Sequence, residues 1–350
     1  MGFQWYATIN SVNVESIISA TLDFNGSYRS SRFELTASIS HGPLGNLWWS
    51  SLEGSLPVEV FLRSQTSGSD VLLFSGLADG ISLDPIRLMA YVHGRDYSSL
   101  LASCSYQASF LNRTASEIAT DIAKRHGLDT EIETTTPFAG SFQRSDHNQM
   151  VLNAHSRVRS EWDVLVLLAK REALEFFIDG RTLVFASLDY METSCVPISY
   201  GDVTGMKFHK GLRQSDETRL IVKSWNTWQN RSFSQEGLLP GGNPVPGPAG
   251  VGNVSESEIA LMKPNLNPSD IGLVAQRYQE SIMKNRLRVD IAMPGGLTPK
   301  VHDTLEVNGT GTAFDTNFIV SSLRCNLSPT TGFTRYISAY SVVPRATLST

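Results

Sequence analysis

Apolar and polar residues alternate in short runs over the first hundred residues. Residues 20–24 and 32–39 alternate, and the turn dipeptide Asn25-Gly26 follows the first run. Alternation of apolar and polar residues places the apolar side chains on one face of a strand, where they can be buried in a core. Two such runs with a turn between them predict an antiparallel pair. Further runs of strand character lie at 56–62, 71–78 and 88–94. Strands at this spacing, with no convincing helix between them, predict a small barrel or sandwich.

Helical spacing begins after about residue 97. Thr114 and Glu117 have the spacing of a capping box, and apolar residues then recur every three to four positions. Gly127 stands where a left-handed C-terminal cap is expected. A second amphipathic pattern starts at Ser160. The sequence therefore predicts two helices, at 114–127 and from Ser160.

A β-hairpin and then further strands follow these helices. Asp179-Gly180 separates two apolar runs, which is a strong hairpin signal. The Gly- and Pro-rich stretch 237–252 predicts an irregular loop or extended arm. A third helix is predicted at 269–285, because Asn267-Pro268 precedes it as a helix start. Strands are predicted at 219–225, 288–293, 304–307, 317–323 and 335–341.

Together these patterns predict a mainly β chain with an α+β insert. The predicted domains are a first β domain at 1–97, an insert with two helices and a β-hairpin at 98–190, and a second β domain at 191–350. The second β domain includes loop 237–252 and helix 269–285. A chain of 350 residues has room for two or three such domains.

Composition narrows the classes of function. The net charge of −5 argues against a protein that binds nucleic acid through an exposed basic surface. No apolar run reaches the roughly 18 residues of a membrane span, so no stable membrane insertion is expected. The first ten residues lack the basic start and apolar centre of a signal peptide, which predicts a soluble, intracellularly made protein.

Motifs for catalysis, cofactors and metals are mostly absent from the sequence. It contains no His-Glu-x-x-His, Gly-x-Ser-x-Gly, P-loop or Cys-x-x-Cys motif. Gly309-Thr310-Gly311 lacks the third glycine of a dinucleotide fingerprint and predicts a turn. Cys104, Cys195 and Cys325 are far apart, so we expect them to act as small apolar residues. The chain is predicted not to be an enzyme, with no catalytic, cofactor-binding or metal-binding residues and no cofactor.

Three groups of residues are weaker candidates for a functional site, and for each of them a purely structural role is the favoured alternative. His147 and His155 do not have a helical metal-ligand spacing, so a polar surface is favoured over a metal site. Asp129, Glu131 and Glu133 alternate, which suits either a carboxylate cluster or, as we favour, a solvated acidic edge. Trp48-Trp49 suits an exposed carbohydrate-binding patch or, as we favour, core or interface packing.

The order of these segments resembles the late-control D family of phage baseplate hub proteins, which is related to the hub part of VgrG proteins. The resemblance spans about residues 10–340, and the linear order of segments supports it more than any single motif. It departs from the family at Ala173-Leu174, where relatives commonly have glycine, at Val301-His302, and in loop 237–252. The segments that resemble the family are the strand exit 92–101, the helix 114–127, the helix 160–172, the hairpin 176–185, the tripeptide 224–226 and the stretch 269–320.

The resemblance implies a bacteriophage tail hub with two tail-tube-like β-barrels. Three subunits would form a pseudo-sixfold ring that joins the tail tube to the central spike, because two similar barrels per chain meet both symmetries. Implied partners are further copies of the chain (a homotrimer), the tail tube or distal tail protein, the spike or tip protein, the tape measure protein, and DNA in transit only. The implied location is the virion tail baseplate, with host cytoplasm during assembly.

Two other functions stay open at this point. One is a receptor- or carbohydrate-binding tail protein that exposes Trp48 and Trp49. The other is a tail-associated peptidoglycan hydrolase that uses carboxylates near Glu131 or Glu133. The sequence distinguishes neither a contractile from a non-contractile tail, nor a phage from a tailocin or gene-transfer particle.

Overall fold

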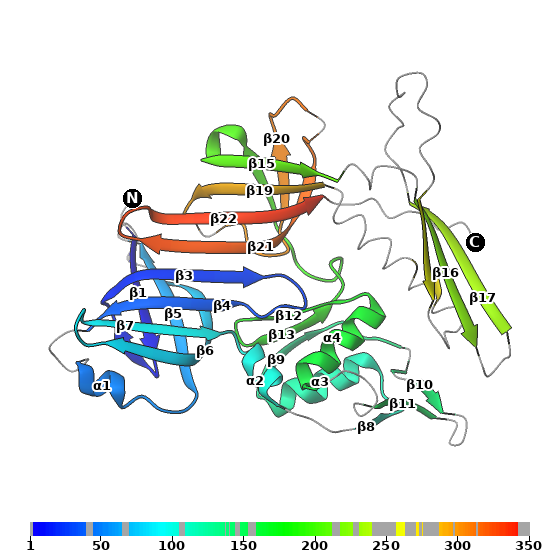
Figure 1. The fold of residues 1–350 in the computed structure, drawn as a ribbon, viewed down its shortest axis with the longest axis horizontal. Helices are drawn as coiled ribbons and strands as arrows, with labels where there is room; N and C mark the ends of the chain where they lie inside the picture. Colours follow the sequence, from blue (N-terminus) through cyan, green and yellow to red (C-terminus); the bar gives the residue numbers. More distant parts are fainter. Residues whose placement is uncertain are drawn as a thin grey trace. The chain divides into compact units, whose positions relative to one another are not determined.

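The structure is a computed structural model, drawn in Figure 1. It describes residues 3–39, 45–64, 70–104, 109–136, 138–139, 141–143, 148–152, 159–211, 218–226, 231–239, 257–262, 271–272, 275, 287–296, 298–312 and 314–341.

The described chain is mainly β, as the alternating pattern predicts. Its helices are α1 (Asn46–Ser50), α2 (Ser98–Ser103), α3 (Ala115–Arg125) and α4 (Glu161–Glu172), with a 3-10 turn η1 (Tyr200–Asp202). Its strands are β1 (Phe3–Ile9), β2 (Val12–Val14), β3 (Ile17–Asn25), β4 (Arg32–Ser38), β5 (Leu56–Ser64), β6 (Asp70–Asp84), β7 (Met89–Arg95), β8 (Ser109–Leu111), β9 (Asp129–Ile132), β10 (Ser141–Gln143), β11 (Asn148–Leu152), β12 (Glu175–Asp179), β13 (Thr182–Ala186), β14 (Cys195–Ser199), β15 (Gly205–Lys210), β16 (Thr218–Asn226), β17 (Arg231–Leu239), β18 (Ser257–Met262), β19 (Leu287–Pro294), β20 (Thr304–Asn308), β21 (Asn317–Ser328) and β22 (Gly332–Ser341). None of the described helices is both long and apolar enough to cross a membrane.

The chain divides into two compact units. The first contains residues 1–193, 292–302 and 321–336, and the second contains residues 194–291, 303–320 and 337–350. Strands β19, β21 and β22 contribute residues to both units. The predicted boundaries at 97 and 190 stay a prediction.

The first unit contains a long antiparallel sheet. Its neighbouring strands run in the order β3, β4, β7, β6, β5, β1 and β2, and β21 pairs with β3 from Ser322 to Leu327. Inward and outward positions alternate along β4 and β7, as the sequence predicts. Phe33 on β4 lies opposite Gly94 on β7, and a side chain at Gly94 would overlap the Phe33 ring. Glycine therefore makes room for an aromatic residue in this core.

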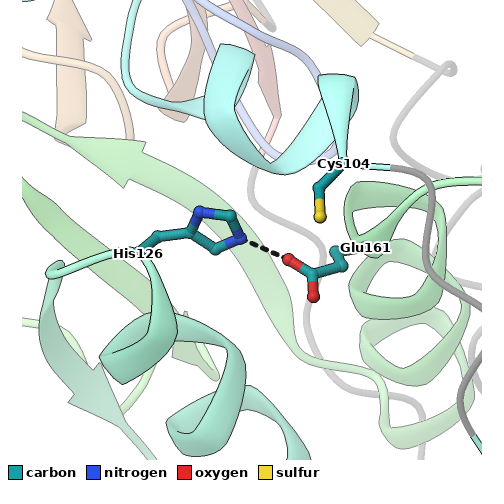
Figure 2. A group of neighbouring side chains, drawn as sticks. All are labelled: Cys104, His126 and Glu161. Carbon is teal, nitrogen blue, oxygen red and sulfur yellow. Dashed lines mark hydrogen bonds and ion pairs between the residues drawn. The ribbon is translucent and has the colours of Figure 1, made fainter.

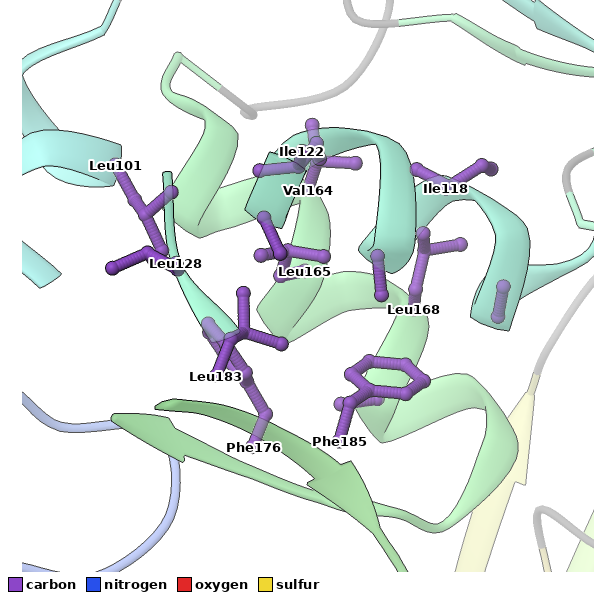
Figure 3. Close-up of a cluster of buried hydrophobic side chains, with 14 of the residues drawn as sticks. Leu101, Ile118, Ile122, Leu128, Val164, Leu165, Leu168, Phe176, Leu183 and Phe185 are labelled. Carbon is purple, nitrogen blue, oxygen red and sulfur yellow. The ribbon is translucent and has the colours of Figure 1, made fainter. Parts of the chain in front are cut away.

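The α+β part of the first unit packs helices α3 and α4 against a three-stranded sheet. The strand order is β12, β13 and β9, with β12 and β13 antiparallel and β9 parallel to β13. Both helices contact the sheet and each other (Figure 1). Figure 3 shows the apolar side chains that fill the space between them. The fully buried members include Ile118 and Ile122 of α3, Leu165 of α4, and Phe176 and Phe185 of the hairpin.

Local signals set the ends of these elements. Thr114 and Ser160 each form a capping box, with Glu117 and Asp163 respectively, so two free N–H groups are satisfied at each helix start. Gly180 has φ of 56° in the turn between β12 and β13, a conformation that favours glycine. The two helix starts and the hairpin turn lie where the sequence predicts them.

The second unit contains strands of two sheets. Strand β14 runs parallel to β20, and β20 is antiparallel to β21. Strand β16 is flanked by β17, antiparallel, and by β18, parallel. The pairings of β14 with β20 and of β16 with β18 join segments that are distant in sequence, which local patterns do not predict.

Three sequence predictions need correction or lie outside the described residues. A short helix, α1, does occur within the first hundred residues. Gly237–Leu239 belong to β17, where pairing with β16 overrides the glycine, so the predicted loop 237–252 starts too early. The rest of that loop lies outside the described residues. In the predicted helix 269–285 only residues 271–272 and 275 are described, and all three are helical.

Candidate functional site

The carboxylate of Asp96 is buried at the junction between strand β7 of the long sheet and helix α2. Asp96 follows β7 directly and is 4% exposed. Its Oδ2 accepts a hydrogen bond from Ser31 N at 2.7 Å, and its Oδ1 accepts one from Ser98 N at 3.1 Å. Its own N–H donates to Ser31 O at 3.0 Å. Asp96 therefore fixes the exit of β7 against the turn before β4 and accepts a hydrogen bond from the N–H of Ser98, the first residue of α2.

Burial has an electrostatic consequence at this position. Removal from water raises the pKa of the Asp96 carboxyl to about 6, although hydrogen bonds from Ser98 and Ser31 act in the opposite direction. The Gly94-Arg95-Asp96 stretch is the strand exit on which the family resemblance partly rests. In the structure, the hydrogen bonds of Asp96 attach this stretch to the turn before β4 and to the first residue of α2.

The β12 edge is joined to the long sheet through Tyr28. Tyr28 N donates to Phe176 O at 2.8 Å, and the Tyr28 hydroxyl donates to Leu174 O at 2.5 Å. The ammonium of Lys170 lies 5.1 Å from the centre of the Tyr28 ring. Both parts of the first unit are therefore connected by directional contacts as well as by the backbone.

The second buried polar group lies where α2, α3 and α4 meet. Cys104 follows α2, His126 ends α3, and Glu161 is the first residue of α4. One donor atom from each of these residues lies within 4.8 Å of the others. Figure 2 shows the three side chains pointing toward one another. We call this group the Cys104–His126–Glu161 cluster.

Glu161 is the centre of this cluster and is fully buried. Its Oε1 accepts from Arg125 Nη1, and its Oε2 contacts His126 Nε2. Its N–H also donates to Cys104 O at 3.3 Å. The Arg125 side chain is 36% exposed and that of His126 is 15% exposed, so one side of the cluster reaches solvent. A buried carboxylate requires such partners, because an unpaired charge is costly in a core.

The candidate residues named from the sequence lie in different environments, and some of them lie outside the described residues. Trp49 is 2% exposed and Trp48 is half-buried, with their rings 4.8 Å apart in an edge-on arrangement. The favoured packing interpretation is therefore confirmed for Trp49. Gly309 and Gly311 lie between β20 and β21 with positive φ, as expected of a turn. His147 and His155 lie outside the described residues.

The acidic residues after α3 do not converge on one site. Asp129 and Glu131 belong to β9, the edge strand of its sheet, and Asp129 is exposed while Glu131 is half-buried. Glu133 accepts a hydrogen bond from Ser187 N at 2.7 Å. The position of β9 supports the acidic-edge interpretation.

The cysteines do not share one environment, contrary to expectation. Cys325 is buried, Cys195 is exposed and Cys104 belongs to the cluster. Only Cys325 fits the role of a small apolar residue in a core. Sequence reasoning missed the cluster because its members come from three separate segments. The one available signal is that His126 and Glu161 stand directly at predicted helix ends, where side chains from different helices meet.

Comparisons with known proteins identify the fold. No protein-family model and no curated protein matches the chain. A 43 kDa tail protein of prophage MuSo2 from Shewanella oneidensis superposes with a TM-score of 0.71 at 13% identity, covering 97% of this chain and 98% of that one. A tail protein from Neisseria meningitidis gives a TM-score of 0.71 at 11% identity, covering 97% of each chain. The chain has the fold of these phage tail proteins.

The same fold extends to a secretion protein. A type VI secretion system component from E. coli, described as similar in structure to the T4 tail proteins gp27 and gp5, superposes with a TM-score of 0.60 at 11% identity. The match covers 97% of this chain and 77% of that one. At these identities the likeness establishes the tail-protein fold, in agreement with the resemblance drawn from the order of sequence segments.

Proposed function

We propose that this chain is a structural hub protein of a bacteriophage tail baseplate. The observation that supports the proposal most is the likeness to two tail proteins, one of them from a prophage, over 97% of the chain. A shared site would involve a few residues, whereas this likeness extends through both compact units. Fold alone does not dictate function, so the proposal also draws on the organisation of the chain.

The finer proposal is a homotrimer. Three chains with two β domains each present six β domains around an axis, which suits a sixfold tail tube on one side and a threefold spike on the other. Closed rings of this kind need head-to-tail interfaces between unlike surfaces. Under this proposal the two β domains are the tail-tube-like barrels predicted at 1–97 and 191–350, and the insert 98–190 lies between them in sequence.

The proposed partners follow from that position. The ring contacts the tail tube or distal tail protein on one face and the spike or tip protein on the other. Its bore passes the tape measure protein and then DNA, and the net charge of −5 suits a wall to which DNA does not adhere. The proposed role is structural rather than enzymatic, in the virion tail after assembly in host cytoplasm.

The mass of the assembled protein tests the proposal. Purified protein alone should scatter light as three times the 38.4 kDa chain, and its complex with the spike partner should contain three copies of the chain. Tail particles purified from the producing cells should contain the chain in a threefold ratio to single-copy components. A stable monomer that never enters tail particles would contradict the hub function.

A further inference from the structure

We propose that Cys104, His126 and Glu161 bind a zinc ion. A thiolate, an imidazole nitrogen and a carboxylate oxygen are the three ligand types that zinc takes in proteins. Harder ions such as Mg²⁺ and Ca²⁺ prefer oxygen ligands alone, so a set that includes sulfur favours zinc. The inference does not depend on the hub function.

The distances suit this ion. The three donor atoms already lie within 4.8 Å of one another. Tetrahedral zinc with bonds of about 2.0–2.3 Å holds its ligand atoms about 3.3–3.6 Å apart. Rotation about the side-chain bonds of three adjacent residues is enough to reach that spacing. The fourth position falls to water, because the His126 side chain is partly exposed and no fourth ligand residue belongs to the cluster among the described residues.

The hydrogen bonds of Glu161 are arranged as a zinc ligand requires. Its Oε2 contacts His126 Nε2, so a proton must lie between these two atoms when no ion is bound. Zinc takes the place of that proton, which moves to Nδ1 of the neutral His126 ring or to water. Oε1 remains with Arg125 Nη1, and such outer contacts to a ligating carboxylate orient it and hold it in position.

The charges around Glu161 accommodate the ion. Glu161 is fully buried and carries a negative charge that Arg125 balances from a partly exposed position. Zinc binding converts the Cys104 thiol to a thiolate and releases its proton. The thiolate and the carboxylate together cancel the two positive charges of the ion. The one positive charge that remains is that of Arg125, whose side chain is 36% exposed and therefore partly hydrated.

The ion would connect three helices. Cys104 follows α2, His126 ends α3 and Glu161 begins α4, and these helices enclose the apolar core of the α+β part (Figures 2 and 3). A ligand that binds only the folded chain stabilises it by mass action. Zinc should therefore raise the unfolding temperature, and a chelator should lower it.

The test uses the untagged full-length protein and its Cys104→Ser variant. Serine keeps the size of the side chain but removes the thiolate, and Cys195→Ser is the matched control because Cys195 is exposed and outside the cluster. Zinc is measured by mass spectrometry after dialysis, and cobalt is then substituted to detect sulfur ligation by its charge-transfer absorption band.

The expected result is about one zinc per chain in the wild type and in Cys195→Ser, with a thiolate–cobalt band in both. Cys104→Ser should lose the band and bind zinc at least about tenfold more weakly. Thermal unfolding of Cys104→Ser without metal shows whether it folds, and His126→Gln provides a second ligand deletion. Equal metal content in the wild type and Cys104→Ser, or a cobalt band that survives in Cys104→Ser, would overturn the proposal and leave a hydrogen-bonded cluster only.

Discussion

Helix α4 has two kinds of buried contact within about one turn. Its apolar face, represented by Leu165, packs among α3 and the β12–β13 hairpin. Its first residue, Glu161, is equally buried but depends on Arg125 and His126. The apolar contact is non-directional and shared among many neighbours, whereas the polar one depends on a few specific atoms. The two regions should therefore respond differently to substitution.

The largest effect is expected from a charge in the apolar region. Leu165→Asp should lower the free energy of unfolding by about 4 kcal/mol or more, because an unpaired carboxylate is then buried. Leu167 on the same helix is 45% exposed, so Leu167→Asp should change it by less than about 0.5 kcal/mol. Urea unfolding measures both, and tail particle yield should be lost only for Leu165→Asp. Similar losses in the two variants would show that the helix face is assigned wrongly.

A smaller loss is expected from the polar region. Glu161→Gln should lower the free energy of unfolding by about 2–3 kcal/mol, because it breaks a buried ion pair. This is less than for a fully buried pair, since Arg125 can turn toward water. The exposed pair of Asp121 and Arg113 is the control, and Asp121→Asn should cost less than about 0.5 kcal/mol. Equal values for the two variants, measured in the same denaturant series, would mean that burial does not distinguish them.

A pH-dependent difference is expected at Asp96. The folded-state pKa of Asp96 is about 6, above the ordinary carboxyl value of 3.8, so between these two pH values the folded state holds a proton that the unfolded state has released. Stability contributed by Asp96 is therefore present below about pH 4 and lost as pH rises to about 6. The advantage of the wild type over Asp96→Asn should shrink across this window by about 3 kcal/mol at most. Unfolding of both proteins at several pH values measures it, and an advantage that grows with pH would contradict the burial effect.

The smallest effect is expected at the C-terminal end of α4, where a substitution should raise the free energy of unfolding and not lower it. Ala173 ends the helix with φ of 58°, a conformation that glycine adopts without strain. Ala173→Gly should raise the free energy of unfolding by up to about 1 kcal/mol. Ala169→Gly, inside the same helix and buried, should lower it by about 1 kcal/mol or more. Thermal unfolding compares the two, and the same sign for both would refute the assigned helix end.

Sequence periodicity predicts much of the fold but little of the polar clusters. The starts of α3 and α4 and the hairpin at Gly180 are local, because each depends on residues three or four positions apart. The parallel pairing of β9 with β13 is not local and was not predicted. In the sequence, Glu161 looks like any acidic residue in the first turn of a helix. Only the packing of α3 against α4 brings His126 into contact with it. Convergence of distant residues depends on tertiary structure, which spacing does not reveal.

The central claim is that the chain forms a threefold hub, and a density map of the tail tip tests it most directly. The account predicts three copies of this chain in a ring around the tail axis, with two β domains from each copy between the tube and the spike. A ring of six copies, or a chain located away from the axis or absent from the particle, would contradict it.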